Sequence, residues 1–543
     1  MLTRVSKKVE ANMEDVFIGV DVGSASVRSA LFDRQGHRLG FSVKPIDQFH
    51  SNSDWIAQSS KQIWQQICLA VRESIAIANV DVAQVRSIGF DATCSLVALD
   101  HQGHPVSISE NNDDNQNIIM WMDHRAKEEA RAINLTNDPV LQYVGGEVSI
   151  EMELPKILWI KHHYPDRYNK IARFFDLADY LVWQATNSDI ASVCTLTCKW
   201  NYLAHKKSFS EKFLNKIDLK DLKDKIPQTV LGLGESAGSL TPKAAEQLGL
   251  HTNVIVATGI IDAHAGGIAL VGSNPQASLA IISGTSNCHM IVNKNPILVS
   301  GVWGPYLDAM LPNYWLNEGG QSAAGALLEW SIRQHEAWPQ LEQEAKQKGC
   351  NYYQLLNHYV NQLEQHNKYL TDDLHILADH HGNRSPRANP DAKGMVSGLT
   401  LETGITALAK YYLATMQAIA YGTLHIINAM TESGYQIDRL IMCGGATKNP
   451  LWLREYANIT GKEIFLAKEE DAVNLGAAIL GAVACKAFKD ISNAAKEMVE
   501  FGNTIKPDLS TQNFHHRKYN VYLQMYQDQL RYNQLMNESF DEK

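Results

Sequence analysis

The chain has 543 residues, of which 45% are hydrophobic and 20% charged, and its formal net charge is −10. This length exceeds one ordinary hydrophobic core and predicts two domains with an active site between them. This composition is typical of a globular protein and favours neither a disordered nor a membrane protein. No concentrated basic stretch is present, so nucleic acid is not expected as a partner, although a small anion can still be held by backbone N–H groups and a metal ion.

Cysteine usage and hydropathy indicate the compartment. Eight cysteines without regular spacing are typical of free thiols in a reducing environment, so a cytoplasmic location is expected. Cys194 and Cys198 are four residues apart, but no second Cys/His pair follows nearby, which disfavours zinc. The polar N-terminal stretch has no apolar signal segment and is expected to be a loose arm. The most apolar window, residues 254–272, is interrupted by Asp262, so no membrane span is expected.

The first predicted elements, over residues 16–40, are two strands joined by a small-residue turn. A related pattern returns at residues 277–295, around Gly-Thr-Ser, so the chain is predicted to contain two similar halves that each begin with a hairpin. Helices are predicted over residues 54–78 and 401–430, and the second is followed by a strand at 440–443. This alternation predicts an α/β fold.

Domain boundaries follow from this repetition. We expect one domain over residues 14–272, a second over 273–510, and a peripheral helix over 511–543. No linker is long or low in complexity, so the two domains are expected to pack together.

The turns of the two hairpins suit phosphate binding. Phosphoryl transfer requires a cradle for the phosphates, a metal ion and a base beside the attacking hydroxyl. Small residues let backbone N–H groups approach a phosphate, and Asp21, at the end of the first strand, could hold Mg²⁺ through water. An ordinary Gly-Ser turn would use the same residues, but two such turns are more specific than one. The residues are Gly23, Ser24 and Ser26 in the first turn and Gly284 and Thr285 in the second.

A third small-residue loop follows the strand at 440–443. Gly445, Ala446 and Asn449 leave room for a flat base or ribose against the backbone, although a plain strand-to-helix turn would use the same residues. The Gly-Lys-Ser/Thr P-loop is absent, and no GxGxxG follows the first strand, so P-loop and Rossmann enzymes are disfavoured.

Asp262 lies in the apolar, glycine-flanked segment ATGIIDAHAGG. A carboxylate is costly to bury there, and such surroundings suit a general base that accepts a proton from a hydroxyl. A helix N-cap is the alternative, and both roles can hold at once.

Other polar and aromatic residues stand inside apolar runs. Sugar sites combine hydrogen-bonding groups that read vicinal hydroxyls with an aromatic ring that packs on the C–H face. Any one of these residues could instead be a structural hydrogen-bonding group. The candidates are Asp91, Trp121, Asp123, Lys199 and Glu318.

Four motifs resemble those of the FGGY carbohydrate kinases: DVGSASVR, GIIDAHA, SGTSN and CGGATKN, in that family's order. The resemblance implies two ribonuclease-H-like domains of the actin and hexokinase type with a cleft between them. The N-terminal domain would carry the sugar site and the first phosphate motif, and the C-terminal domain would bind ATP. It also implies Mg²⁺ as cofactor, a sugar and ATP as the small-molecule partners, and a homodimer.

The resemblance also implies roles for single residues. Asp21 would hold the metal, Arg28 would support the first loop, and Asp262 would be the catalytic base. Many family members have Thr where this chain has Ala25, and Ser24 or Ser26 can substitute for it. The remaining implied roles are contact with the transferred phosphoryl group for Gly284 and Thr285, and with adenosine for Gly445, Ala446 and Asn449.

Within the family, the chain resembles the ribulokinase branch. Trp121, Asp123, Lys199 and Glu318 match pentulose-contacting positions, and the segment DHHGNRSPRANPD is of ribulokinase type. Cys94 stands where L-ribulose enzymes typically carry Ala, and the TCSLV stretch around it resembles that of D-ribulose kinases. We therefore expect phosphorylation of D-ribulose to D-ribulose 5-phosphate. The alternatives are kinases of L-ribulose, xylulose, ribitol or glycerol, a non-catalytic sugar sensor, and an actin-like ATPase.

Overall fold

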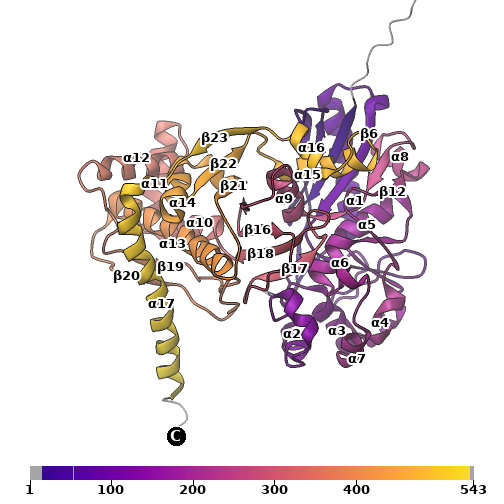
Figure 1. The fold of residues 1–543 in the computed structure, drawn as a ribbon, viewed down its shortest axis with the longest axis horizontal. Helices are drawn as coiled ribbons and strands as arrows, with labels where there is room; N and C mark the ends of the chain where they lie inside the picture. Colours follow the sequence, from indigo (N-terminus) through magenta and orange to yellow (C-terminus); the bar gives the residue numbers. More distant parts are fainter. Residues whose placement is uncertain (1–14, 53, 539–543) are drawn as a thin grey trace, which may run out of the picture.

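The computed structural model describes residues 15–52 and 54–538. The predicted N-terminal arm and the last five residues of the predicted C-terminal helix lie outside this part of the chain. The described residues form two lobes, each built on a mixed sheet (Figure 1). Among them, no helix is both long enough and apolar enough to cross a membrane.

The N-terminal lobe contains a seven-stranded sheet with the order β12-β13-β6-β1-β2-β3, and β14 also pairs with β6. β1 and β2 form the predicted antiparallel hairpin, and β6 returns parallel to β1. The strands are β1 (Val16–Val22), β2 (Ser26–Phe32), β3 (Arg38–Pro45), β6 (Val85–Ala92), β12 (Ser236–Ser239), β13 (Ile255–Ala257) and β14 (Ile260–Ile261).

The C-terminal lobe repeats this arrangement with the order β17-β18-β16-β15-β21-β22-β23. β15 and β16 form an antiparallel hairpin, and β21 lies parallel to β15, as β6 lies beside β1. The prediction of two similar halves is thus confirmed. The strands are β15 (Ser278–Ser283), β16 (Asn287–Asn293), β17 (Trp303–Leu307), β18 (Trp315–Gln321), β21 (Arg439–Cys443), β22 (Glu463–Ala467) and β23 (Phe501–Ile505).

Helices surround both sheets. The predicted helix at 54–78 is shorter, because residues 56–58 form strand β5 and the Ser59 side chain caps the helix start. The larger helices are α1 (Ser60–Ala78), α3 (Glu153–His163), α5 (Leu177–Thr186), α10 (Gly325–Gln334), α11 (Trp338–Lys348), α12 (Tyr352–Glu364), α13 (Gly404–Glu432), α14 (Pro450–Thr460) and α17 (Gln512–Glu538). The long α17 extends away from the C-terminal lobe (Figure 1).

An accessory region of the N-terminal lobe carries a five-stranded sheet with the order β4-β5-β8-β7-β9. Its strands are β4 (Phe49–His50), β5 (Ile56–Gln58), β7 (Leu96–Leu99), β8 (Ile118–Ile119) and β9 (Arg173–Asp176). Shorter helices in this lobe are α2 (Lys127–Asn134), α4 (Pro165–Lys170), α6 (Val193–Lys199), α7 (Glu211–Lys216) and α8 (Pro242–Leu248). Two small sheets pair β10 (Ile190–Ser192) with β11 (Thr229–Leu231), and β19 (His375–Leu377) with β20 (Met395–Ser397).

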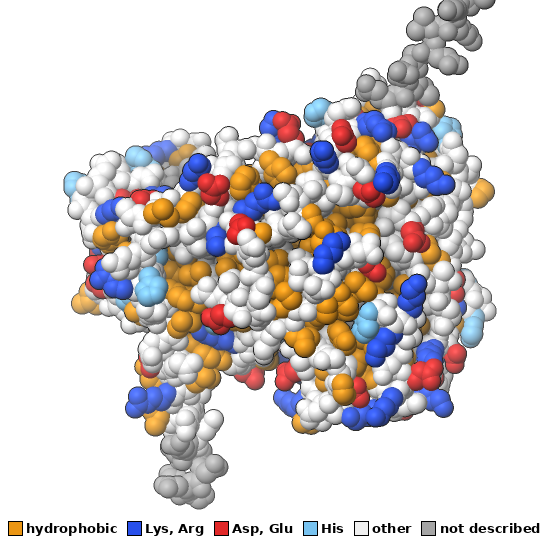
Figure 2. All heavy atoms as spheres, viewed as in Figure 1, with side chains coloured by type: hydrophobic (Ala, Val, Ile, Leu, Met, Phe, Trp, Pro, Cys, Tyr) orange, Lys and Arg blue, Asp and Glu red, His pale blue; other side chains and the backbone are white. Residues whose placement is uncertain are grey.

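Two helices join the lobes: α9 (Asp262–Val271) and α15 (Ala472–Ala484). α15 comes from the C-terminal half of the sequence but packs on β1 and β6 of the N-terminal sheet, with α16 (Ile491–Met498) beside it. A Cβ atom at Gly19 or Gly89 would stand 1.9 or 2.0 Å from a backbone oxygen of α15. The predicted boundary at 272/273 separates the two sheets in sequence, and α15, from the second predicted domain, packs on the sheet of the first. Figure 2 shows hydrophobic side chains gathered on the visible face where the two lobes meet.

Candidate active site

Three carboxylates meet at the ends of adjacent strands in the N-terminal lobe. Asp21 of β1 lies in register with Asp91 of the parallel strand β6. β14 pairs with β6 at Asp91, and Asp262 follows β14 directly as the first residue of α9. The sheet topology thus brings together two residues predicted for the metal and for the base. It also places Asp91, predicted as a sugar contact, against Asp21.

Burial and repulsion from neighbouring carboxylates both raise the pKa of Asp21 and of Asp91 in this carboxylate cluster. Burial raises the pKa of Asp21 to about 7, although Arg28, with Nη2 2.5 Å from Asp21 Oδ2, lowers it. Burial, followed by the charge of Asp21, raises the pKa of Asp91 well above its usual value. Arg28 also approaches Asp471, just before α15, at 3.7 Å. Carboxylate oxygens are ligands that Mg²⁺ prefers, so the cluster suits a divalent cation.

Asp262 begins α9 rather than capping it from outside. Its Oδ1 accepts a hydrogen bond from the N–H of Ala263 at 2.7 Å, whereas the N-cap residue is Ile261. Burial raises the pKa of Asp262, and the Ala263 N–H, His264 and Arg28 oppose that rise. A carboxylate with a raised pKa is a better proton acceptor, as a general base requires.

The first small-residue turn is tight and held from several sides. The N–H of Gly23 donates to the carbonyl of Ser26 at 3.0 Å. The carbonyl of Ser24 accepts from the side-chain amides of Gln48 and Gln58 at 2.9 and 3.0 Å. The Ser24 hydroxyl accepts from Trp121 Nε1–H at 3.0 Å. The turn predicted to bind phosphate is therefore hydrogen-bonded to Trp121, an aromatic residue predicted to contact the sugar.

The second turn, Gly284 and Thr285, is exposed and rests on the start of α10. The carbonyl of Thr285 accepts from the N–H groups of Ala324 and Ala326, and the carbonyl of Gly284 accepts from Gly325. A Cβ atom at Gly284 would meet nothing within 4 Å. The space beside its α-carbon is therefore open, whereas its N–H donates to the Ser286 carbonyl at 2.9 Å.

The third loop lies against the strand that carries the second turn. Gly444 has a φ of 93°, and a Cβ there would stand 2.3 Å from the Ser283 carbonyl oxygen. Gly445 faces open space, and Ala446 is buried. Asn449 caps α14, with Oδ1 accepting from the N–H groups of Leu451 and Trp452 and Nδ2 donating to Tyr412. Its side chain is thus committed to the protein.

A second buried charge cluster contains Lys199 and Glu318. The Lys199 Nζ lies 4.3 Å from the centre of the Trp303 ring, and the side chain is buried. Burial opposes ionisation of Glu318, but Lys199 and His264 outweigh it and lower the pKa of Glu318 to about 2. Burial raises the pKa of the Cys94 thiol, and the positive charge of Lys199 opposes this rise. Three predicted sugar contacts therefore lie in one electrostatically linked group.

Asp123 is buried and already fully engaged. Its Oδ2 accepts from Arg125 Nη2 at 2.7 Å and from the N–H of Ile56 at 2.6 Å, and its Oδ1 accepts from Arg125 Nε at 2.9 Å. The guanidinium of Arg125 also lies over the rings of Trp55 and Trp159. Asp123 therefore stabilises the accessory region by holding Arg125 and the backbone of Ile56.

Comparison with known families identifies both halves of the chain. The N-terminal domain of the FGGY family of carbohydrate kinases matches residues 16–269, and the C-terminal domain of that family matches residues 279–485. The chain belongs to the FGGY family. It is therefore a carbohydrate kinase, and the predicted two-domain α/β fold is confirmed.

Several FGGY relatives match nearly the whole chain. An "FGGY carbohydrate kinase domain-containing protein" of Homo sapiens is 42% identical, covering 97% of this chain and 99% of the relative. A D-ribulokinase of Saccharomyces cerevisiae is 38% identical, with coverage of 87% and 72%. A ribulokinase of Halalkalibacterium halodurans is 31% identical, with coverage of 89% for both chains.

Solved FGGY structures share the fold. A xylulose kinase from Rhodospirillum rubrum superposes with a TM-score of 0.77 at 19% identity, covering 95% of this chain and 99% of that one. The glycerol kinase of Plasmodium falciparum with ADP gives a TM-score of 0.77 at 15% identity, with coverage of 94% and 98%. At these identities the likeness concerns the fold alone.

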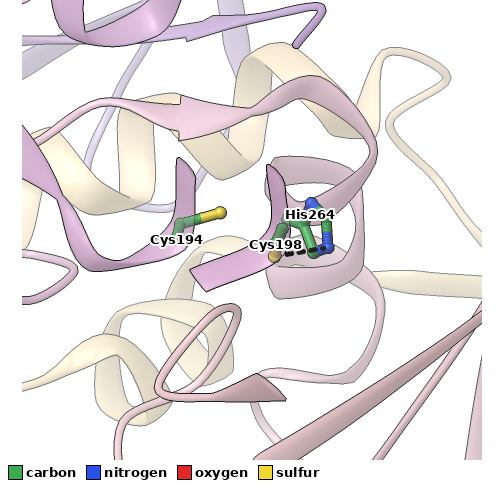
Figure 3. A group of neighbouring side chains, drawn as sticks. All are labelled: Cys194, Cys198 and His264. Carbon is green, nitrogen blue, oxygen red and sulfur yellow. Dashed lines mark hydrogen bonds between the residues drawn. The ribbon is translucent and has the colours of Figure 1, made fainter. Parts of the chain in front are cut away.

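One residue that sequence reasoning missed in this FGGY site is His264. It is buried on α9, and its Nε2 lies 3.4 Å from Glu318 Oε2 and 3.8 Å from Cys198 Sγ. Figure 3 shows the imidazole beside Cys198, with Cys194 on the same helix, α6. The GIIDAHA motif contained a signal, because His264 stands two residues after the candidate base.

The same three side chains bring together possible metal ligands. Donor atoms of Cys194, Cys198 and His264 all lie within 4.8 Å of one another, so the structure supplies the third donor that was absent near the cysteines in sequence. Zinc bonds of about 2.0–2.3 Å in a tetrahedron put ligand atoms roughly 3.5–3.8 Å apart. The Cys198–His264 distance is within that range, and other donors of the group would have to move closer.

Proposed function

We propose that the protein transfers the γ-phosphoryl group of ATP to the terminal hydroxyl of a ketopentose, with D-ribulose as substrate and D-ribulose 5-phosphate as product. The main support is the position of Asp262, at the start of α9 and beside the Asp21–Asp91 pair. The proposed base therefore lies beside carboxylates that suit a metal ion. It also interacts electrostatically with Glu318, which belongs to the buried polar cluster that suits a sugar.

In this mechanism Asp262 accepts the proton of the hydroxyl as that oxygen attacks the γ-phosphorus of ATP, and the bond from this phosphorus to the β–γ bridging oxygen breaks, so that ADP leaves. Asp21 and Asp91 would hold Mg²⁺, directly or through water, and the ion would neutralise phosphate charge. The backbone of Gly23 to Ser26 on one side and of Gly284 and Thr285 on the other would bind the phosphates. Gly445 and Ala446 would hold the adenosine, and Asn449 would shape that loop as the cap of α14.

For the sugar, we assign binding to Lys199, Glu318, Trp121 and Cys94, with Asp123 holding Arg125 behind them. Lys199 offers donors and Glu318 offers acceptors, and both stay charged in the site because each stabilises the other. The bond from Trp121 to Ser24 would couple sugar binding to the first phosphate turn. Closure that excludes water would prevent wasteful hydrolysis of ATP.

The choice of D-ribulose is supported by the yeast relative described as a D-ribulokinase and by Cys94. The test is an ADP-release assay with D-ribulose, L-ribulose, D-xylulose, L-xylulose, ribitol and glycerol. We expect the highest kcat/KM with D-ribulose. A higher value with glycerol or D-xylulose would refute the substrate and leave the kinase assignment intact. ATP turnover independent of any sugar would favour an actin-like ATPase activity.

The base is tested by Asp262→Asn. We expect kcat to fall on the order of 10²–10⁴-fold, as for loss of a general base, while nucleotide binding persists. Unchanged kcat would refute the role of Asp262 as the base.

We further propose that the protein is a homodimer in the cytoplasm, on the basis of its resemblance to the family. Light scattering of the purified protein tests the oligomeric state.

A further inference from the structure

Arg384 connects the two lobes. It lies between β19 and β20 in the C-terminal half, and its Nη2 is 3.0 Å from Oε1 of Glu151, which precedes α3 in the N-terminal half. The side chains of Arg384 and Glu151 are only 10% and 15% exposed. Ion pairs that are shielded from water are weakened less by salt than surface pairs.

Aromatic rings from both lobes flank the guanidinium. Its central carbon lies 5.2 Å from the ring centre of Trp303, on β17, and 6.0 Å from that of Trp121. Both distances are within the range of cation–π attraction. Trp121 is bonded to the first phosphate turn, and the Trp303 ring also faces Lys199. Arg384 therefore stands among the residues assigned to the sugar.

The Arg384 side chain packs against Gly320, where a larger residue would not fit. A Cβ atom there would lie 2.6 Å from Arg384 Cδ and 2.9 Å from its Nη1. Gly320 is two residues after Glu318 on β18, so its missing side chain would point to the same face of the sheet. Arg384 thus crosses β18 beside Glu318. One glycine of the EGGQS motif is explained by this crossing.

One donor of Arg384 has no acceptor. Among the described residues, the buried Nε has no hydrogen-bond partner, whereas Nη2 donates to Glu151. A buried N–H without an acceptor carries an appreciable free-energy cost, and such groups are rare unless a ligand or water supplies the acceptor. A sugar hydroxyl is an acceptor of the required kind.

We propose that Arg384 is a sugar-binding residue that also bridges the lobes: its pair with Glu151 holds the site closed, and its Nε–H donates to a hydroxyl of the bound ketopentose. The ligand class rests on the proposed function. The bridge between the lobes does not depend on which sugar is phosphorylated.

The test compares Arg384→Gln with Arg384→Lys and with a matched control, Arg387→Gln. Arg387 lies in the same segment and is equally buried, but it pairs with Asp379 within the C-terminal half. We expect Arg384→Gln to raise the KM for the ketose about 10–100-fold, the range for a lost hydrogen bond to a charged group, with the KM for ATP unchanged. Arg384→Lys should restore only part of this loss, because it keeps the charge and lacks Nε.

Glu151→Gln tests the bridge. Combined with Arg384→Gln it should add little to the single variant, in both ketose KM and the free energy of unfolding, because both changes remove the same contact. Additive effects, an unchanged ketose KM in Arg384→Gln, or an equal rise in Arg387→Gln would each overturn the proposal. If the wild-type protein phosphorylated no ketopentose, the proposed function would be refuted. The unfolding free energies of the single and double variants would still show whether Arg384 and Glu151 bridge the lobes.

Discussion

At the scale of single residues, the raised pKa of Asp262 has a consequence for catalysis. Burial raises this pKa above the usual value near 3.8. A general base works when deprotonated, so activity is present above the folded-state pKa and is lost as the pH falls through it. We predict an acidic limb of kcat/KM at a pH higher than an ordinary aspartate would give. Rate measurements at saturating Mg²⁺ test this, and a flat profile down to pH 4 would contradict it.

His264 should affect sugar binding through Glu318. Its Nε2 is 3.4 Å from Glu318, so His264→Leu removes a partner of a buried carboxylate. We predict a KM for the ketose higher by about 10-fold or more, with little change in the KM for ATP, and partial rescue by His264→Gln. The control is His289→Gln, since His289 is equally buried but bonds to Thr423 on α13. Equal losses in both variants would indicate a folding defect instead.

The positions of residues in short local motifs were predictable, and the side-chain partners of residues that depend on tertiary contacts were not. Asp21 and Asp262 stand in short motifs, at a strand end and at a helix start, and the structure brings both to the same place. Asp91 faces Asp21 because β6 is parallel to β1, a register that no local pattern specifies. Likewise, Asp123 is engaged by Arg125, and Asn449 caps a helix. Nothing in the sequence revealed that these partners would occupy their side chains.

At the scale of elements, the crossing of α9 and α15 depends on Gly476. A Cβ atom there would lie 1.9 Å from the carbonyl oxygen of Ala265, three residues after Asp262. Backbone atoms cannot yield as a flexible side chain would, so Gly476→Ala must displace one helix. We predict a loss of about 1–3 kcal/mol or more in the free energy of unfolding, together with a lower kcat, because α9 carries the base.

Urea unfolding and steady-state rates measure these two effects. The matched control is Gly502→Ala, where the nearest atom to a new Cβ is the Lys468 Cγ at 3.4 Å, an ordinary contact distance. A Gly476→Ala protein as stable and active as Gly502→Ala would contradict the close crossing.

The elements themselves were largely predictable, because each has a local signal. Both hairpins and the long buried helix α13 are present close to their predicted bounds. The start of α1 was wrong by six residues, since the Ser59 cap and strand β5 precede it. With only three residues, Ile-Ala-Gln, β5 is too short for its sequence to be distinguished from the first turn of a helix.

At the scale of the whole molecule, the spatial domains could not be read from the order of the sequence. The repeat of two hairpins correctly predicted two sheets, and family matches over 16–269 and 279–485 follow the same division. Yet α15 lies on the N-terminal sheet. Its apolar, glycine-containing sequence suits any buried face, so only the tertiary structure specifies which sheet it covers.

This arrangement predicts that the N-terminal half does not fold alone. One hydrophobic core contains Phe17 of β1, Leu475 and Ala478 of α15, and Ala280 of β15, so a fragment of residues 15–272 would expose the face of β1 and β6 that α15 covers. We expect the fragment to bind a hydrophobic dye and to lack a cooperative thermal transition. A fragment extended by residues 470–500 through a flexible linker should regain near-ultraviolet circular dichroism and part of the cooperativity, because it restores the missing layer. A cooperative transition in the unextended fragment would show that its core is complete without α15.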